Sequence, residues 1–484
     1  MRDVTRDAHA VMLAAFRGAE LPAWLPDAYA RGLGGICLYG DNVDPVHGLA
    51  PLARAVAALD PTAVLAADEE GGDVTRLHMA TGSPSPGNAA LGVVDDVTVT
   101  RTIAAGIGAE LRAAGIWLDL GPCADVDSNP ANPVIGTRSF GADPDLVARH
   151  TSAYVAGLAD AGVAASVKHF PGHGDTTADS HIDLPRVTAE RTVLDQRELI
   201  PFRAAVEAEA ATIMTSHVVL EALDPVHPAT LSHAVLTGLL RGELGYDGVI
   251  VTDALDMAGA SAELGIDGAA VASLAAGADL LCLGPEPSDG PATLTRVVDA
   301  VVRAVTDGSL PAARLAEAAD RVAALRSRWS SAVPAQAALD RLRERGEAAA
   351  DDVARTVVDR LDVTPLGGPA IVIRIDSGSN PAVGTTSWGD LDLPGGDRVD
   401  LTADELERTP PYTGRVLIVV RNVAGRSDVW AWIDRQIKEN PETLVIDLGR
   451  PGPFSTTVER HVLHLRGSSP ALVGAVAARL RGRP

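Results

Sequence analysis

The sequence predicts a (β/α)8 barrel, or TIM barrel, followed by a smaller C-terminal α/β domain, and three observations support this fold class. Short apolar runs recur eight times in the first 285 residues, Ala-rich stretches with helical spacing separate most of them, and the pattern changes after residue 285. Near-continuous apolar strands alternating with helices are typical of a parallel sheet, and eight such units favour a closed barrel.

Each of the eight runs has the length of a strand and is bounded by Gly, Asp or Pro. The expected strands are residues 8–16, 34–40, 63–68, 115–122, 163–170, 211–217, 248–255 and 278–284. Helical spacing is clearest between these runs at 144–162 and 199–210.

The second half of the chain predicts a separate unit. Helices are expected over 292–308 and 311–329, and a connector plus a helix over 330–361. Strand signals return at 369–375, 414–422, 442–449 and 462–467, with helices at 429–440 and 471–480. We therefore expect a catalytic barrel over 1–335, a connector over 336–367 and an α/β domain over 368–484. That domain contains neither GxGxxG nor GxxxxGK[ST], so its sequence gives no support for a nucleotide site.

Composition and charge narrow the possible partners. The net charge is −23 without a basic cluster, which argues against binding to nucleic acid or to anionic membranes. Cys37, Cys123 and Cys282 are far apart in apolar runs, so we expect buried free thiols rather than disulfides. No apolar run approaches the roughly 20 residues of a membrane span, and the N-terminal segment lacks the long apolar core of a signal peptide. We expect a soluble, cytoplasmic protein, and the sequence does not indicate its oligomeric state.

Charged and imidazole side chains lie near the carboxyl ends of the expected strands. In such barrels the active site lies at the carboxyl ends of the strands. Charged or imidazole side chains lie at or just after the ends of five expected strands, namely Asp68, Asp125, Lys168, His169, His217 and Asp253. The repetition favours a pocket over ordinary polar loop ends.

The segment "KHFPGHGDTTADSHIDLP", residues 168–185, allows three interpretations: a metal site, a catalytic loop or a solvated turn. Its histidines and aspartates could supply metal ligands, namely His169, His173, Asp175, Asp179 and His181. They show no regular ligand spacing, however, and no HExxH motif occurs, so we expect no metal. Asp179 precedes His181 by two residues, so in a turning loop the carboxylate could orient the imidazole for proton transfer. For this pair alone, a solvated turn remains equally plausible.

The segment "GVIVTDALDM", residues 248–257, places Asp253 at the end of an expected buried strand. A carboxylate fixed there can attack an anomeric carbon and form a glycosyl–enzyme ester. The alternative is that Asp253 caps the helix that follows.

Four segments in this order resemble glycoside hydrolase family 3, in particular its bacterial β-N-acetylglucosaminidase branch of the two-domain type. They are "DEEGGDVTRL", "NPVIGTRSFG", "KHFPGHGDTTADSH" and "GVIVTDALDM". The resemblance covers about residues 1–330 and implies Asp253 as nucleophile and His181, paired with Asp179, as general acid/base. It further implies that Asp68, Arg138, Lys168 and His169 hold the first sugar, that Met257 lines that pocket, and that no cofactor is needed. Alternatively, Arg138 forms an ion pair that holds its loop, and His169 forms a hydrogen bond in the core.

The chain departs from the family pattern at one segment. Relatives usually carry "DQEGG" followed by Arg, whereas this chain has Glu69 and Asp73. These carboxylates, if near the pocket, would change the preference beyond the first sugar.

The expected function is that of a retaining exo-β-N-acetylglucosaminidase that removes terminal GlcNAc from muropeptide fragments or chitooligosaccharides. One alternative is a phosphorylase of β-N-acetylglucosaminides or β-glucosides on the same scaffold, since a histidine base permits phosphate as the nucleophile without requiring it. Another is a sugar-binding protein that has lost catalysis, which the presence of Asp179, His181 and Asp253 argues against.

Overall fold

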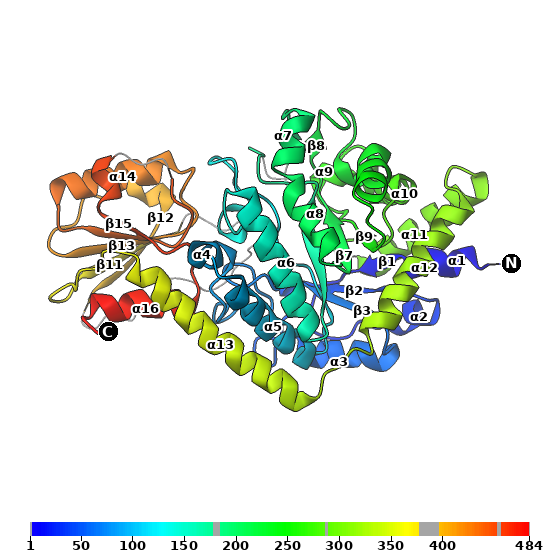
Figure 1. Ribbon diagram of the computed structural model, residues 1–484, viewed down its shortest axis with the longest axis horizontal. Coiled ribbons are helices and arrows are strands. Elements are labelled where there is room, and N and C mark those ends of the chain that lie inside the picture. The colour runs from blue at the N-terminus through cyan, green and yellow to red at the C-terminus, as the bar shows by residue number, and fades with distance from the viewer. Residues whose placement is uncertain (1, 178–183, 286–288, 377–395, 453–455, 484) are drawn as a thin grey trace.

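The computed structural model describes residues 2–177, 184–285, 289–376, 396–452 and 456–483. Its ribbon shows a barrel and a separate, smaller C-terminal domain, with a long helix running along both (Figure 1). The predicted fold class is confirmed.

All eight predicted barrel strands are present and pair in parallel. Their order is β10-β1-β2-β3-β4-β5-β7-β9, and a parallel bridge between Val251 and Leu280 joins the two ends of the sheet. The strands are β1 (Met12–Ala14), β2 (Gly35–Leu38), β3 (Val64–Ala67), β4 (Leu118–Asp119), β5 (Ala164–Phe170), β7 (Thr212–Thr215), β9 (Val249–Val251) and β10 (Leu281–Cys282).

The first predicted strand, 8–16, is partly wrong. Residues Val4–Ala10 form helix α1 instead, and only Met12–Ala14 is a strand. The Asp3 carboxylate accepts hydrogen bonds from the backbone N–H groups of Thr5 and Arg6, and such an N-cap stabilises the start of a helix.

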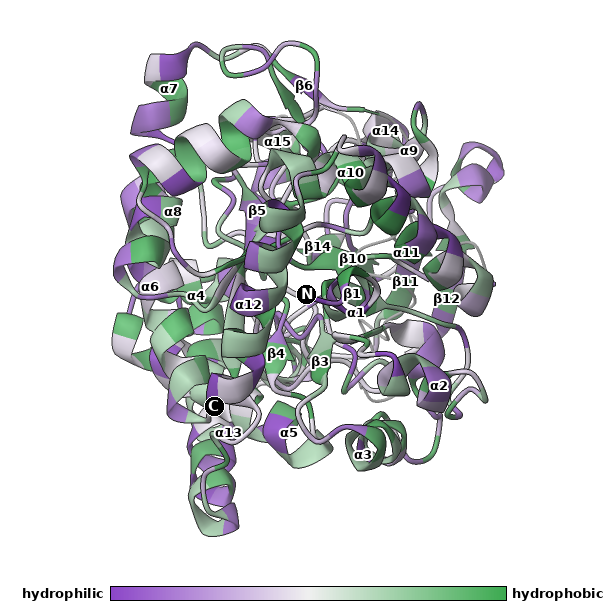
Figure 2. Ribbon diagram, turned by 90° about the vertical axis from the view of Figure 1, so that its right-hand side faces the viewer, coloured by the Kyte–Doolittle hydropathy of each residue, from purple (hydrophilic) through white to green (hydrophobic). Residues whose placement is uncertain are grey.

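Helices surround the strands, as Figure 2 shows for α3, α5, α6, α8, α10 and α11. The helices of the barrel are α1, α2 (Leu25–Ala30), α3 (Ala50–Leu59), α4 (Asn88–Val94), α5 (Val97–Ala114), α6 (Pro144–Asp160), α7 (Arg191–Gln196), α8 (Leu199–Glu207), the π-helical η4 (Ala234–Glu243), α9 (Ala258–Ser261), α10 (Gly265–Ala276), α11 (Gly290–Asp307) and α12 (Ala312–Trp329). Short 3-10 turns are η1 (Gly40–Asn42), η2 (Gly136–Arg138) and η3 (Ala229–Leu231), and β6 (Arg186–Val187) pairs with β8 (Val219–Leu220).

Side-chain alternation along the strands separates two cores. Cys37, Val64 and Ala66 belong to a cluster that fills the barrel, whereas Ile36 and Leu65 pack in a larger cluster between strands and helices. This is the pattern expected of a small barrel, whose inward and outward residues alternate along every strand. The barrel interior is therefore a packed core, and only its ends are open to a ligand.

The C-terminal domain contains a five-stranded parallel sheet in the order β12-β11-β13-β14-β15. Its elements are β11 (Ile371–Asp376), β12 (Arg398–Thr402), η5 (Ala403–Arg408), β13 (Val416–Val420), α14 (Ser427–Glu439), β14 (Leu444–Asp447), α15 (Thr456–Glu459), β15 (Val462–His464) and α16 (Pro470–Leu480). The sequence did not predict β12, because this edge strand has no apolar run and its residues alternate between exposed and half-buried.

Helix α13 (Gln336–Asp359) connects the two domains. It packs along α5 and also contacts α4 and α16 (Figure 1). Where α13 crosses α5, Gly346 faces Gly106: a Cβ atom added at Gly346 would lie 2.9 Å from the Cα of Gly106. Glycine at both positions allows the two backbones to approach this closely.

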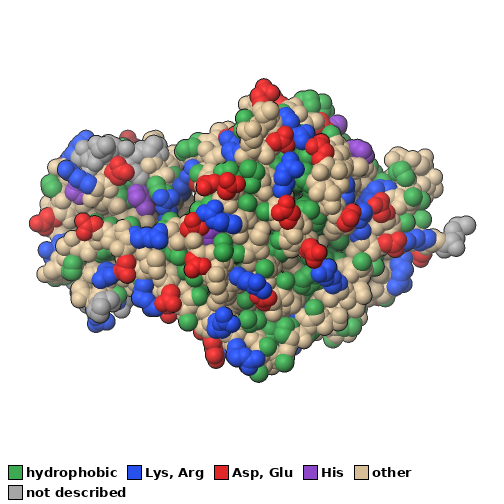
Figure 3. All heavy atoms as spheres, viewed as in Figure 1, with side chains coloured by type: hydrophobic (Ala, Val, Ile, Leu, Met, Phe, Trp, Pro, Cys, Tyr) green, Lys and Arg blue, Asp and Glu red, His purple; other side chains and the backbone are tan. Residues whose placement is uncertain are grey.

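The surface shows no concentrated basic region on the face drawn in Figure 3, where cationic and anionic side chains are interspersed. Among the described residues, no helix is both long and apolar enough to cross a bilayer. The three cysteines are free and buried, as predicted.

Candidate active site

A cavity of about 390 Å³ lies at the carboxyl ends of the barrel strands. Its volume falls in the range of small-molecule sites, about 300–1,000 Å³. The six described residues to which we assigned catalytic or sugar-binding roles all line it, namely Asp68, Arg138, Lys168, His169, Asp253 and Met257.

Two carboxylates and two cations form one side of the cavity. The Lys168 Nζ atom lies 2.6 Å from Asp68 Oδ1 and 2.7 Å from Glu70 Oε1. Arg138 donates two hydrogen bonds to Glu70, of 3.0 Å from Nε and 2.8 Å from Nη2. Glu70 thus pairs with both cations at once, and the side chains of all three are at most 5% exposed. Arg138 thus forms an ion pair and also lines the cavity. Its two interpretations, as a residue that holds the sugar and as one that holds its loop, do not exclude each other.

Each charged group of this network stabilises the ionised form of its partners. Burial disfavours the ionised form of Glu70, but Arg138 and Lys168 outweigh it and hold the pKa of the carboxyl well below its usual range. Burial likewise opposes the charge of Lys168, but Asp68 and Glu70 raise the pKa of its amine. The cavity therefore presents fixed charges at neutral pH, and charge-assisted hydrogen bonds to sugar hydroxyls are strong.

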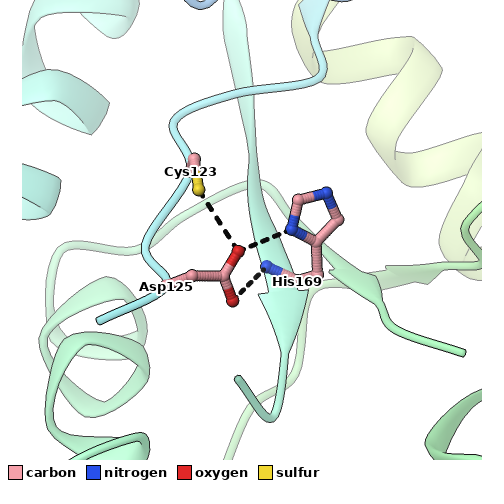
Figure 4. A group of neighbouring side chains, drawn as sticks. All are labelled: Cys123, Asp125 and His169. Carbon is pink, nitrogen blue, oxygen red and sulfur yellow. Dashed lines mark hydrogen bonds and ion pairs between the residues drawn. The ribbon is translucent and has the colours of Figure 1, made fainter. Parts of the chain in front are cut away.

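His169 is oriented by a buried carboxylate (Figure 4). Its Nδ1 lies 2.6 Å from Asp125 Oδ2, and its Nε2 lies 3.3 Å from Arg138 Nη2. A guanidinium can only donate, so Nε2 accepts and Nδ1 carries the proton that bonds Asp125. His169 is thus both hydrogen-bonded in the core and exposed to the cavity, as each of its two interpretations requires.

Asp125 collects four donors. Besides His169 Nδ1, it accepts hydrogen bonds from the backbone N–H groups of His173 and His169, at 2.6 and 3.3 Å, and from the Cys123 thiol at 3.2 Å. Burial opposes its ionisation, but His169 and His173, which also donates its backbone N–H, lower the pKa of Asp125 to about 2. Cys123, Asp125 and His169 are close enough to hold a metal ion. Burial raises the pKa of the Cys123 thiol, however, and the three side chains are hydrogen-bonded, which favours a positioning role.

Consecutive residues of β5 reach the same cavity because the strand pairing is interrupted. Side chains normally alternate between the two faces of a strand. The pairing of β5 with β7 changes register between Val167 and Phe170. Such an irregularity re-aims side chains, and here Lys168 and His169 both line the cavity.

Asp253 lies two residues beyond β9 and is half-buried at the cavity. Its Oδ1 accepts the backbone N–H of Ala254 at 2.8 Å. The next helix, α9, begins at Ala258 with Met257 as its N-cap residue, so Asp253 does not cap a helix. His217 supports this turn by donating from Nε2 to the carbonyl of Ala254 at 3.0 Å. A carboxylate held in this way is suited to act on a bound ligand.

The acid/base pair predicted from the sequence, Asp179 and His181, lies outside the described residues. The preceding stem, residues 171–177, is anchored in the barrel. Arg197 bonds Asp175 through Nη2 at 2.6 Å and Glu198 through Nε at 2.6 Å. His173 lines the cavity, and its burial, together with the neighbouring His169, lowers its pKa to about 4.

The two departures from the family pattern do not reach the cavity. Glu69 points the other way and accepts the backbone N–H groups of Arg76 and Leu77 at 2.8 and 2.9 Å. Asp73 accepts hydrogen bonds from Thr137 and from Ser468 of the C-terminal domain. Our expectation that both carboxylates change the sugar preference from within the pocket is therefore not supported by their positions.

The sequence did not predict that several further residues line the cavity. They are Tyr39, Glu70, Arg76, His173 and Asp256. Glu70 could have been found: in an extended segment residues i and i+2 share a face, so Asp68 and Glu70 point together and Glu69 points away. Arg76, which lies 3.4 Å from Asp68, comes from the loop that follows, and no periodicity predicts its return to the cavity.

Comparisons with known proteins show the family of the chain. Residues 19–325 match the model of the glycosyl hydrolase family 3 N-terminal domain. A β-hexosaminidase A from Pseudoalteromonas piscicida is 38% identical over 283 residues, which cover 54% of this chain and 47% of the relative. A β-hexosaminidase from Alkalilimnicola ehrlichii is 37% identical over 273 residues, which cover 55% of this chain and 78% of the relative. This chain thus matches less than half of the Pseudoalteromonas protein.

Solved structures extend the likeness to the C-terminal domain. A family 3 β-N-acetylglucosaminidase from Paenibacillus superposes with a TM-score of 0.85 at 29% identity, covering 100% of this chain and 97% of the other. A β-glucoside phosphorylase superposes with a TM-score of 0.76 over 100% of this chain and 92% of its own, but at 20% identity it shows the fold alone.

Proposed function

Because the chain belongs to glycosyl hydrolase family 3, we propose that it is a retaining exo-β-N-acetylglucosaminidase. It releases terminal GlcNAc from muropeptide fragments or chitooligosaccharides through a covalent glycosyl–enzyme. The observation that carries the proposal is the position of Asp253 in the cavity formed with the Asp68–Glu70–Lys168 network. The names of the relatives, β-hexosaminidases and a β-N-acetylglucosaminidase, support the choice of sugar.

In the proposed mechanism, an Asp253 oxygen attacks the anomeric carbon while His181, oriented by Asp179, gives its proton to the departing oxygen. Water then attacks the same carbon, His181 takes the proton of that water, and the ester to Asp253 breaks. Asp68, Lys168, Arg138 and His169 hold the sugar hydroxyls, and Met257 packs against the sugar.

The nucleophile is tested by Asp253→Asn, which keeps the shape of the side chain and removes its charge. We expect kcat on an aryl GlcNAc glycoside to fall at least about a thousandfold, equivalent to about 4 kcal/mol. Asp267→Asn is the matched control, because Asp267 lies on α10 in an exposed ion pair with Arg296. Near-wild-type turnover by a folded Asp253→Asn enzyme would overturn the assignment.

The acid/base role of His181 is tested by comparing leaving groups. A p-nitrophenolate needs little protonation, whereas a sugar oxygen needs much, so His181→Ala should slow chitobiose far more than p-nitrophenyl GlcNAc. Added azide needs no general base and should yield a glycosyl azide. Equal losses on both substrates, without an azide product, would move the role to another residue.

Hydrolysis is favoured over phosphorolysis by the charges of the cavity. Its described lining contains four carboxylates, Asp68, Glu70, Asp253 and Asp256, against three cations, Arg76, Arg138 and Lys168. Each of these cations is paired with Asp68 or Glu70. A phosphate would have to compete with these carboxylates. In 10 mM phosphate, NMR should therefore show two free GlcNAc for each chitobiose cleaved. One free GlcNAc and one GlcNAc 1-phosphate for each chitobiose would establish the phosphorylase instead.

A further inference from the structure

One barrel loop, residues 126–138, lies between the C-terminal domain and the stem 171–177. The loop follows β4 and ends in the 3-10 turn η2, which carries Arg138 into the cavity. The loop therefore contacts stem 171–177 and also carries a side chain that lines the cavity.

On the side of the stem, the side-chain amide of Asn132 makes several hydrogen bonds. Asn132 Nδ2 donates to the carbonyl oxygens of His173 and Gly174, at 2.8 and 3.1 Å, and to Thr176 Oγ1 at 3.2 Å. Its Oδ1 accepts the backbone N–H groups of residues 134 and 135 at 2.9 and 2.8 Å, which fixes the orientation of the amide. The contact is also tight in the backbone, because a Cβ atom added at Gly174 would overlap the carbonyl oxygen of Val126.

On the other side of the loop, the C-terminal domain supplies an arginine. Arg450 lies three residues beyond β14. Its Nε is 2.9 Å from Asp127 Oδ2, and its Nη1 donates to the carbonyl oxygen of Asn129 at 2.7 Å. The Arg450 and Asp127 side chains are each only 13% exposed, so the pair is largely shielded from solvent.

A second contact closes the other end of the same loop. Thr137 Oγ1, next to Arg138, donates to Asp73 Oδ2 at 2.7 Å, and the other Asp73 oxygen accepts from Ser468 of the C-terminal domain. Asp73 stands where the family pattern has Arg, so this chain has a carboxylate at the one departure that faces its second domain.

We propose that the C-terminal domain positions stem 171–177, and that Arg450 is the positioning residue: it holds loop 126–138, which holds the stem through Asn132. This inference rests on the proposed function, because His181 continues from that stem. Arg450 touches no substrate and acts through residues of the barrel. It gives the second domain, which carries no motif of its own, a role in the reaction.

Removing Arg450 should impair the step that needs an accurately placed proton donor. A displacement of about 1 Å can cost about a hundredfold in rate. We expect Arg450→Ala to lower kcat/KM on chitobiose at least about tenfold, but on p-nitrophenyl GlcNAc less than about threefold, because that leaving group needs little protonation. A merely structural role would lower both by the same factor, through the fraction of folded enzyme.

Three variants sharpen the test. Arg426→Ala is the matched control, because Arg426 pairs with Asp428 inside the C-terminal domain. Arg450→Lys keeps the charge and should restore part of the loss. Asn132→Ala should change the substrate ratio in the same direction, and the double variant with Arg450→Ala should be no worse than the stronger single variant if both act along one path.

Hydrogen exchange gives a readout that is independent of activity. Amides of residues 171–177 should exchange faster in Arg450→Ala than in wild type or Arg426→Ala. Unchanged exchange with equal losses on both substrates overturns the positioning role, and if Arg450→Ala does not fold, the same comparison is made with Arg450→Lys. If the wild-type enzyme cleaves neither substrate but the stem amides still exchange faster in Arg450→Ala, Arg450 positions the stem and the proposed function is rejected.

Discussion

At the scale of single residues, Glu70 organises the cavity. It is the partner of both Lys168 and Arg138, and all three side chains are removed from solvent. Removing one partner of a buried ion pair leaves an uncompensated charge, which is usually far more costly than losing a surface pair. Here one substitution would leave two cations short of a partner, although Lys168 would keep Asp68.

We therefore predict that Glu70→Gln lowers the free energy of unfolding by about 3 kcal/mol, measured by urea denaturation. Glu317→Gln is the control: Glu317 also pairs with two arginines, Arg314 and Arg321, but is 51% exposed and should cost less than about 1 kcal/mol. Equal losses in the two variants would show that Glu70 is not the centre of a buried network.

A second prediction concerns acid. The pKa of Asp125 is about 2 in the folded protein, below the value of about 3.9 expected when the chain unfolds. In the unfolded chain the Asp125 carboxyl binds a proton below pH about 4. In the folded protein it stays ionised down to pH about 2. The stabilisation by Asp125 is therefore complete above pH 4 and is lost as the pH falls towards 2, on the order of 2–3 kcal/mol.

The measurement is urea denaturation at several pH values between 5 and 2 for wild type and Asp125→Asn. The variant should be less stable at pH 5 and should lose less stability on acidification. Asp267→Asn should keep the wild-type slope, because its carboxylate is exposed. Parallel curves for wild type and Asp125→Asn would contradict the lowered pKa.

At the scale of elements, the sequence predicted the barrel strands because each is an apolar run between breakers. The same rule misjudged other elements, among them α1 and β12. The first three residues of the apolar run 8–16 belong to α1. The start of this helix is set by the N-cap at Asp3 and not by hydrophobicity. Strand β12 forms through pairing with β11, and its own residues Arg398–Thr402 carry no apolar signal.

The candidate site was predictable to the extent that it sits on strand ends. Asp68, Lys168, His169 and Asp253 follow from their positions at strand ends. Alternation alone would place only one of Lys168 and His169 at the cavity, and the change of register in β5 brings in both. Arg76 and Asp256 lie on loops, whose paths depend on tertiary contacts that no local pattern encodes. The partners of Arg450 could not be predicted either, because its contacts with Asp127 and Asn129 join segments more than 300 residues apart.

The crossing of α5 and α13 gives a prediction with an unusual sign. Gly→Ala inside a helix usually stabilises a protein by about 0.5–1 kcal/mol. At Gly346 the added Cβ would lie 2.9 Å from the Cα of Gly106, so the helices must separate, and we expect a net loss of about 1–3 kcal/mol. Gly474→Ala in α16 is the control, because a Cβ there meets nothing within 4 Å and should stabilise. Thermal unfolding of the two variants should shift in opposite directions, and a shift of the same sign would reject the tight crossing.

At the scale of the whole molecule, a long helix, a shared apolar cluster and polar contacts join the described parts of the two domains. Helix α13 contacts both α5 of the barrel and α16 of the C-terminal domain, and Arg450 and Ser468 reach barrel loops beside the cavity. From the positioning role proposed above, we expect a substitution of Arg450 to change catalysis although this residue is not among those that line the cavity.

The pairing of Lys168 and Arg138 with Asp68 and Glu70 also has a consequence for the solution around the enzyme. Mobile ions screen exposed charges strongly and buried pairs weakly. A neutral sugar forms hydrogen bonds with side chains that are already ion-paired. Its binding therefore neither adds nor removes net charge in the cavity. KM for p-nitrophenyl GlcNAc should therefore change less than about twofold between 50 and 500 mM NaCl. A steep dependence would mean that the network opens to solvent before the sugar binds. An enzyme built in this way would hold its affinity for the sugar as the salinity of its surroundings changes.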